Sequence, residues 1–152
     1  MNEIGHLADQ HRRALEGGAW HGPAILEALS GVTAPVAAAR PLADAHSIWE
    51  IVRHIEAWDR VTIRRIAGET VSLSDEEDWP SIEKTDRASW RRDVEAMKAT
   101  HRELNRAMAR LTTARLDRKP SPGSSIKLFH LIYGIIQHEI YHAGQIALLK
   151  KA

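Results

Sequence analysis

The chain has 152 residues, a length typical of one domain and sufficient to bury a hydrophobic core, so we expect a single domain over 1–152. Its 21 basic and 20 acidic residues nearly cancel, so the composition lacks the positive excess of nucleic-acid-binding proteins. The absence of cysteine excludes disulfides, thiolate metal ligands and a thiol nucleophile supplied by the chain. No apolar run approaches the ~18 residues of a membrane span, and the N-terminal residues lack a signal-peptide pattern. We therefore expect a cytoplasmic protein that has neither a nucleic acid nor a membrane as its partner.

The first third of the chain predicts one long helix followed by short elements. Apolar residues at helical spacing predict a helix over 3–16. After Gly17 and Gly18, the sequence predicts a short helical segment over 24–29. The stretch 33–45 contains two prolines and is predicted to be a connector with at most one helical turn.

The second long helix has a clear start and end in the sequence. Ser47 is its predicted N-cap, and Glu50, three residues later, completes a capping box. Apolar residues up to Ile66 form a core-facing stripe, and Gly68 ends the helix. The acidic segment 69–85 is predicted to be a surface loop lying over the bundle.

Two more helices complete the predicted fold. Inward positions of the segment 86–111 alternate in steps of four and three, close to the 3.5-residue repeat of packed helical bundles. A break rich in proline, glycine and serine precedes the fourth predicted helix, 126–150, which is the most apolar and should lie centrally. No segment alternates with the two-residue period of a strand. We therefore predict an all-α protein, a four-helix bundle with short connector helices.

The fourth predicted helix carries a pair of histidines, His138 and His142, four residues apart. Residues at this spacing lie about 40° apart on one helix face, so the two imidazoles can bind one metal ion. Both interrupt an inward-facing apolar stripe, and buried polar groups need partners. A shared metal would satisfy both rings, whereas the alternative is that each only forms hydrogen bonds in the core.

A metal site of this kind needs a third ligand, which we expect upstream because only ten residues of this sequence follow His142. Three inward or flanking histidines compete for this role, and periodicity does not choose between them: His11, His54 and His101. Residues 138–142 also match the His-Glu-x-x-His signature of zinc proteases, in which Glu139 would be the general base. The protease reading lacks a downstream ligand and a substrate-binding strand, so Glu139 is expected to form a salt bridge or to support a ligand.

Two segments together resemble the DinB-like (YfiT-type) metalloprotein superfamily. They are Ser-Ile-Trp-Glu-Ile-Val-Arg-His-Ile-Glu-Ala-Trp at 47–58 and His-Glu-Ile-Tyr-His-Ala-Gly-Gln-Ile at 138–146. The resemblance covers nearly the whole chain and implies a four-helix bundle with a divalent metal. One histidine of the second helix and two of the last would hold it, which in this sequence are His54, His138 and His142.

The resemblance also implies a function, because characterised relatives use low-molecular-weight thiols such as mycothiol, bacillithiol or glutathione. Three protein ligands leave coordination positions open, which is typical of catalytic sites. We therefore expect an enzyme in which Zn²⁺ or Ni²⁺ activates an exogenous thiol for transfer to an electrophile, in detoxification or stress response. Two alternatives remain, namely a metal-dependent hydrolase of a small ester or amide, and a non-catalytic metal- or ligand-binding stress protein.

Four residues are candidates for the pocket around the metal: Glu50, Trp58, His101 and Gln145. Glu50 or Glu56 is expected to orient His54 through its second ring nitrogen. Trp58 has the alternative role of ordinary packing. Five tryptophans are many for a chain of this size, and members of the family are frequently dimeric, so we also expect a homodimer.

Overall fold

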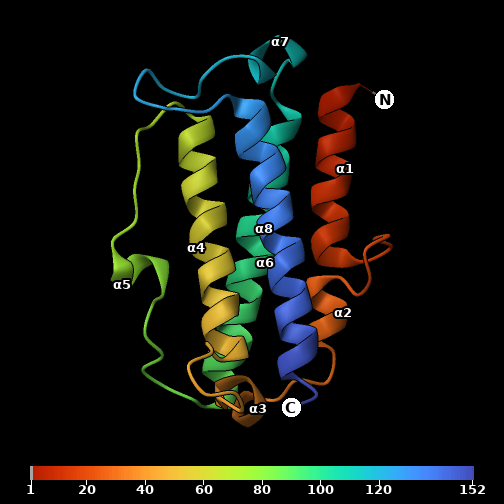
Figure 1. The fold of residues 1–152 in the computed structure, drawn as a ribbon, viewed down its shortest axis with the longest axis vertical. Coiled ribbons are helices and arrows are strands. Elements are labelled where there is room, and N and C mark those ends of the chain that lie inside the picture. The colour runs from red at the N-terminus through yellow and green to blue at the C-terminus, as the bar shows by residue number, and fades with distance from the viewer. Residues whose placement is uncertain (1) are drawn as a thin grey trace.

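The computed structural model describes residues 2–152, in which eight helices form the fold. The four long helices lie side by side along the long axis of the molecule (Figure 1): α1 (Glu3–Glu16), α4 (Ile48–Ile66), α6 (Arg87–Ala109) and α8 (Leu128–Leu149). The four short helices lie in the connections: α2 (Ile25–Leu29), α3 (Ala34–Ala38), α5 (Asp75–Asp78) and α7 (Thr113–Leu116). Residues 2–152 contain no strand, so the predicted fold class, an all-α four-helix bundle, is confirmed.

The predicted bounds of the long helices agree with the structure to within two residues, because the signals at the helix ends are local. The side chain of Ser47 accepts a hydrogen bond from the backbone N–H of Glu50 at 3.2 Å, and the Glu50 carboxylate accepts one from the N–H of Ser47 at 2.7 Å. This capping box fixes the start of α4. Gly68, just after α4, has a φ of +99°, a left-handed conformation that glycine adopts at little cost.

The long helices pack as a closed ring of four. α4 packs against α6 and α8, and α1 packs against the same two helices. Figure 1 shows that α4 and α6 run in one direction while α1 and α8 run in the other. Because α4 and α6 are parallel neighbours, the chain between them must return along the whole length of the bundle. Residues 67–86 make this return on the outer side of α4 and carry α5 (Figure 1).

The hydrophobic core consists of two clusters, one toward each end of the bundle. One includes Trp49, Met97 and Ile146, and the other includes Leu104 and Ile132. On each long helix, a buried polar side chain lies between the residues of the two clusters; these four are His11, Asp59, His101 and Glu139. The bundle therefore has a polar layer at mid-height, with one side chain from each long helix.

No helix within residues 2–152 combines the length and the apolar character that crossing a bilayer demands.

Candidate metal centre

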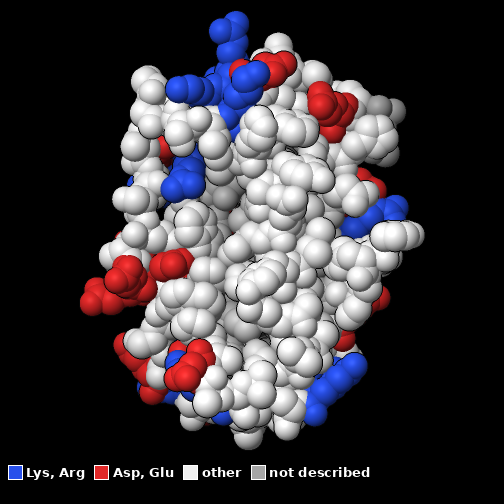
Figure 2. All heavy atoms as spheres, in the orientation of Figure 1, with Lys and Arg blue, Asp and Glu red and all other residues white. Residues whose placement is uncertain are grey.

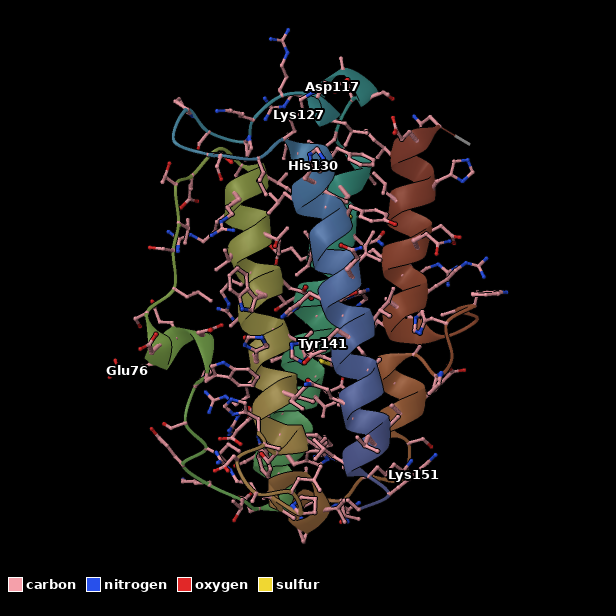
Figure 3. All side chains as sticks on the ribbon, in the orientation of Figure 1. Glu76, Asp117, Lys127, His130, Tyr141 and Lys151 are labelled. Atoms are coloured by element: carbon pink, nitrogen blue, oxygen red, sulfur yellow. The ribbon has the colours of Figure 1, made fainter. Side chains whose placement is uncertain are left out.

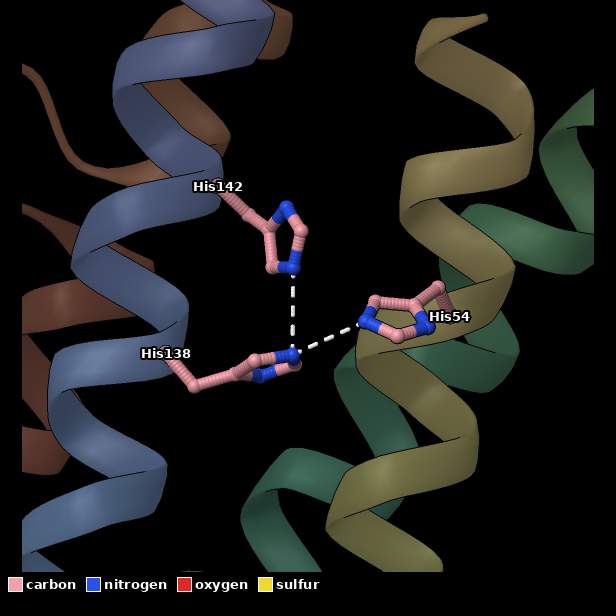
Figure 4. Close-up of side chains that lie close together, drawn as sticks. All are labelled: His54, His138 and His142. Atoms are coloured by element: carbon pink, nitrogen blue, oxygen red, sulfur yellow. Dashed lines mark hydrogen bonds between the residues drawn. The ribbon is translucent and has the colours of Figure 1, made fainter. Parts of the chain in front are cut away.

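Three histidines from two helices converge on one point between α4 and α8. Nε2 of His54 lies 2.9 Å from Nε2 of His138, which in turn lies 3.1 Å from Nε2 of His142 (Figure 4). A tetrahedral ion bound at 2.0–2.1 Å holds its nitrogen ligands about 3.3 Å apart. The three nitrogens are thus close to the spacing that a metal ion needs, and we refer to His54, His138 and His142 as the triad.

The outer nitrogens of two triad rings have hydrogen-bond acceptors. We assign a proton to Nδ1 of His54, which donates to the backbone carbonyl of Asp78 at 2.8 Å and lies 3.1 Å from Oδ1 of the same residue. Nδ1 of His142 donates to Oε1 of Gln145 at 2.6 Å. A proton on Nδ1 leaves the Nε2 lone pair free to bind an ion. Nδ1 of His138 is buried and has no hydrogen-bond partner among residues 2–152.

The environment of the triad favours neutral imidazoles. Burial lowers the pKa of His138 to about 3 and that of His142 to about 4. Burial also lowers the pKa of His54. Neutral imidazole is the form that binds metal ions, so the donor set fits a divalent cation at neutral pH.

The return connection 67–86 covers the triad on the α4 side. The Trp79 ring stacks on the His54 ring with a centroid separation of 3.8 Å, and the His46 ring stacks on Trp79 at 3.5 Å. Nε1 of Trp58 donates to Oδ1 of Asp78 at 2.7 Å, which ties the connection to α4. Sequence analysis missed Asp78 and Trp79, although a tryptophan in an otherwise acidic segment indicates that part of the segment is buried.

Two cavities reach the triad. The larger, about 460 Å³, is lined by His142 together with His46, Trp79, Tyr141 and Gln145. The smaller, about 230 Å³, is lined by His138 with Trp58, Arg65 and His130 among others. The triad is therefore reached from two sides, and both cavities are large enough for part of a small molecule.

The remaining predicted site residues occupy different places. Trp58 and Gln145 lie at the triad, as described above. The Glu50 carboxylate caps α4 and forms an ion pair with Arg40. Glu56 accepts a hydrogen bond from Thr100 at 3.1 Å and pairs with Arg60, so Asp78 rather than either glutamate lies against Nδ1 of His54.

Of the histidines outside the triad, His130 lies at the beginning of α8, well away from Tyr141 farther along the helix (Figure 3). His46 lies between α3 and α4, where its side chain is 42% exposed and its ring stacks on Trp79. His11 and His101, which competed with His54 as the third ligand, are both fully buried in the polar layer of the bundle.

This polar layer forms a second cluster, which we call the core tetrad: His11, Asp59, His101 and Glu139. One nitrogen or oxygen from each residue lies within 4.8 Å of those of the other three. Burial by itself would raise the pKa of Glu139, but the neighbouring His11 and His101 imidazoles lower it to about 2. Glu139 thus forms the expected salt bridge, with His101 as a partner, inside the core.

Comparison with known proteins adds the family. The model of the DinB superfamily matches residues 18–146. The curated proteins and the solved structures give no match. The matched region contains α2 to α7, most of α8 and all three triad histidines. Because the match spans well over half of the sequence, the chain belongs to the DinB superfamily.

Proposed function

We propose that this protein is a metal-dependent enzyme that joins an exogenous low-molecular-weight thiol to an electrophile. In this proposal His54, His138 and His142 hold the metal ion, with Zn²⁺ or Ni²⁺ as the natural candidates for imidazole ligands. The observation that carries the proposal is the convergence of three Nε2 atoms from neutral imidazoles, with His142 lining one cavity and His138 lining another.

Residues around the triad would keep the metal-binding histidines oriented and exclude water from the site. Asp78 and Gln145 fix the outer nitrogens of His54 and His142, which keeps their rings oriented without a metal ion. The Trp79 ring covers one face of His54 and also lines the larger cavity, where it would pack against the apolar part of a substrate.

The thiol would be supplied by a cosubstrate, since the chain contains no cysteine. A bound divalent cation would act as a Lewis acid that lowers the pKa of a thiol or water molecule brought to it. The two cavities support a reaction with two substrates, because one reaches His142 and the other reaches His138. Arg65 and His130 line the smaller cavity and would favour an anionic substrate there. A role in detoxification or stress response in the cytoplasm would follow from this chemistry.

The proposal is tested with the metal-loaded protein, glutathione, mycothiol or bacillithiol as the thiol, and a chromogenic aryl halide as the electrophile. We expect loss of the electrophile that requires both thiol and metal, stops with chelator and is abolished by His54→Ala. His21→Ala is the matched control, because His21 is an exposed histidine that lies outside the triad and both cavities, and it should retain metal and turnover.

Other outcomes separate the alternatives. Metal-dependent cleavage of an aryl ester without added thiol would replace the transferase proposal with a hydrolase. Stoichiometric metal without turnover in either assay would leave a metal-binding stress protein. A metal-free wild-type chain after incubation with zinc and nickel would overturn the metal site itself.

We also propose that two copies of the chain pair through the outer face of α8. Tyr133, Tyr141 and Leu148 on this face are 49%, 65% and 62% exposed, and because Tyr141 and Leu148 also line the larger cavity, the second copy would form part of that cavity's wall. The only charged residue of α8 is Glu139, which is buried in the core tetrad. A large apolar area without charge is typical of protein–protein interfaces.

A further inference from the structure

The core tetrad lies outside the triad and has no part in the proposed reaction. Each of its members comes from a different long helix: His11 from α1, Asp59 from α4, His101 from α6 and Glu139 from α8. All four residues are 0% or 1% exposed. Four-helix bundles build metal sites in this way, from side chains of facing helices that project into the core.

Three of the separations within the core tetrad lie around those of metal ligands, and all lie within 4.8 Å. Nδ1 of His101 lies 2.8 Å from Oε1 of Glu139 and 3.7 Å from Oδ2 of Asp59. Nε2 of His11 lies 3.3 Å from Oε1 of Glu139. Ligand atoms around a tetrahedral ion at 2.0–2.2 Å are about 3.3–3.6 Å apart, within the range of these three distances.

The hydrogen bonding of the core tetrad is incomplete. Five of its buried polar atoms have no hydrogen-bond partner among residues 2–152: Nε2 of His11, Nε2 of His101, both carboxylate oxygens of Asp59 and Oε2 of Glu139. Buried polar atoms without partners are costly and rare in native proteins, so several in one cluster indicate a missing group. A cation within the cluster would give a partner to Nε2 of His11 and to the carboxylate oxygens of Asp59 and Glu139.

The charges of the core tetrad favour a cation. Two carboxylates lie in the core, and within residues 2–152 neither forms an ion pair with lysine or arginine. A divalent cation would displace the extra proton of His101, and the ion with two carboxylates and two neutral imidazoles then gives a site with no net charge. Burying a neutral assembly costs far less than burying two carboxylates with imidazoles as their only counter-charges.

We propose that the core tetrad is a second metal site, separate from the triad, that binds a first-row divalent cation such as Zn²⁺. The site is closed to solvent and uses four protein ligands, which is the pattern of structural rather than catalytic metal sites. It would tie all four long helices together at mid-height. The His11 and His101 rings are stacked at 3.8 Å, and because a ligating lone pair lies in the ring plane, the stack must open when the ion binds.

The test counts metal ions per chain. Tag-free protein is stripped with chelator, loaded with Zn²⁺, desalted and analysed by plasma mass spectrometry. We expect two zinc ions per wild-type chain, one in the triad variant His138→Ala/His142→Ala, and one in the tetrad variant Asp59→Asn/Glu139→Gln. The tetrad variant keeps the shapes of both side chains while removing their charges. His21→Ala, at an exposed position outside both clusters, is the control for adventitious binding and should keep two.

The outcomes separate the two sites. One zinc ion in the wild type and none in the triad variant would overturn the second site. One zinc ion in both would instead overturn the triad and support the core tetrad. The triad variant also gives a measurement that does not depend on the folding of the tetrad variant. Its thermal midpoint should rise with added Zn²⁺, because a ligand that binds only the folded chain stabilises it, and an unchanged midpoint would contradict the proposal.

Discussion

The orientation of His142 depends on one hydrogen bond inside its own helix. Oε1 of Gln145 accepts the Nδ1 proton of His142 at 2.6 Å, so the amide selects the tautomer that presents Nε2 to an ion. A residue three positions along an α-helix lies on the same face, which explains why α8 supplies both the ligand and its acceptor. Gln145 also lines the larger cavity, so one side chain connects the triad to the surface that a substrate would contact.

Replacing Gln145 tests this arrangement. Gln145→Leu removes the acceptor while keeping a side chain of similar size, and we expect a 10- to 100-fold weaker metal affinity, roughly the usual effect of losing such a partner. The measurement is competition with a chromogenic chelator. Gln137→Leu, an exposed position on the same helix, is the control and should leave the affinity unchanged. Equal affinities of the two variants would show that the hydrogen bond does not orient His142.

At the scale of helices, the start of α4 sets the position of His54. The capping box of Ser47 and Glu50 satisfies backbone N–H groups that would otherwise lack partners at the helix start. α5 begins with a similar box, in which Ser74 caps and Glu77 reaches back, but α5 has four residues and none of them is buried. The two capping boxes therefore form the same hydrogen bonds, but only α4 is also stabilised by buried side chains.

We expect Ser47→Ala to lower the free energy of unfolding by about 1 kcal/mol, the usual cost of losing an N-cap side chain. Ser74→Ala should lower it by less than about 0.5 kcal/mol, because α5 contributes little to the core. Urea denaturation followed by circular dichroism measures both values. A loss that is equal for the two variants would mean that the start of α4 adds nothing beyond local capping.

The helices were predictable because their signals are local. Asp86, like Ser47, accepts the N–H of the residue three positions on, at 2.8 Å, and so marks a helix start within four residues of sequence. The choice between His11, His54 and His101 was different, since periodicity shows that a side chain faces inward but not which layer it joins. In the structure each of the three lies in one of two polar clusters: His54 lies in the triad, while His11 and His101 lie in the core tetrad.

The partners of the triad were less predictable still. Asp78 and Trp79 reach His54 only because α4 and α6 are parallel and the chain must return along α4. No local pattern in the sequence encodes that direction. Glu50 and Glu56 lie near His54 along the sequence. However, the Glu50 carboxylate caps the start of α4 and the Glu56 carboxylate pairs with Arg60.

On the scale of the whole molecule, charge is distributed unevenly. Figure 2 shows a broad face without lysine, arginine, aspartate or glutamate at its centre, over the position of α8 in Figure 1, with the charged side chains gathered at the periphery. A stable interface buries on the order of 800 Å² per partner. The exposed rings of Tyr133 and Tyr141 are anchors suited to such a contact.

If two copies pair through this face, Tyr133→Glu should convert a dimer to a monomer, because it places a charge at the contact without touching the triad. Light scattering after size-exclusion chromatography gives the mass directly, and the wild-type chain should have twice the mass of 17.0 kDa. Val36→Glu, at an exposed apolar position on α3, is the matched control and should remain dimeric. A wild-type mass of one chain would exclude this interface.

The adjacency of His138 and Glu139 on α8 has a consequence for how the sequence can change. Consecutive residues point about 100° apart, so one turn of a single helix supplies both the triad and the core tetrad. Inserting or deleting one residue between Leu128 and His138 would rotate both side chains away from their clusters together. The rotational register of α8 is thus constrained twice over, and repacking this helix to tune one cluster would necessarily perturb the other.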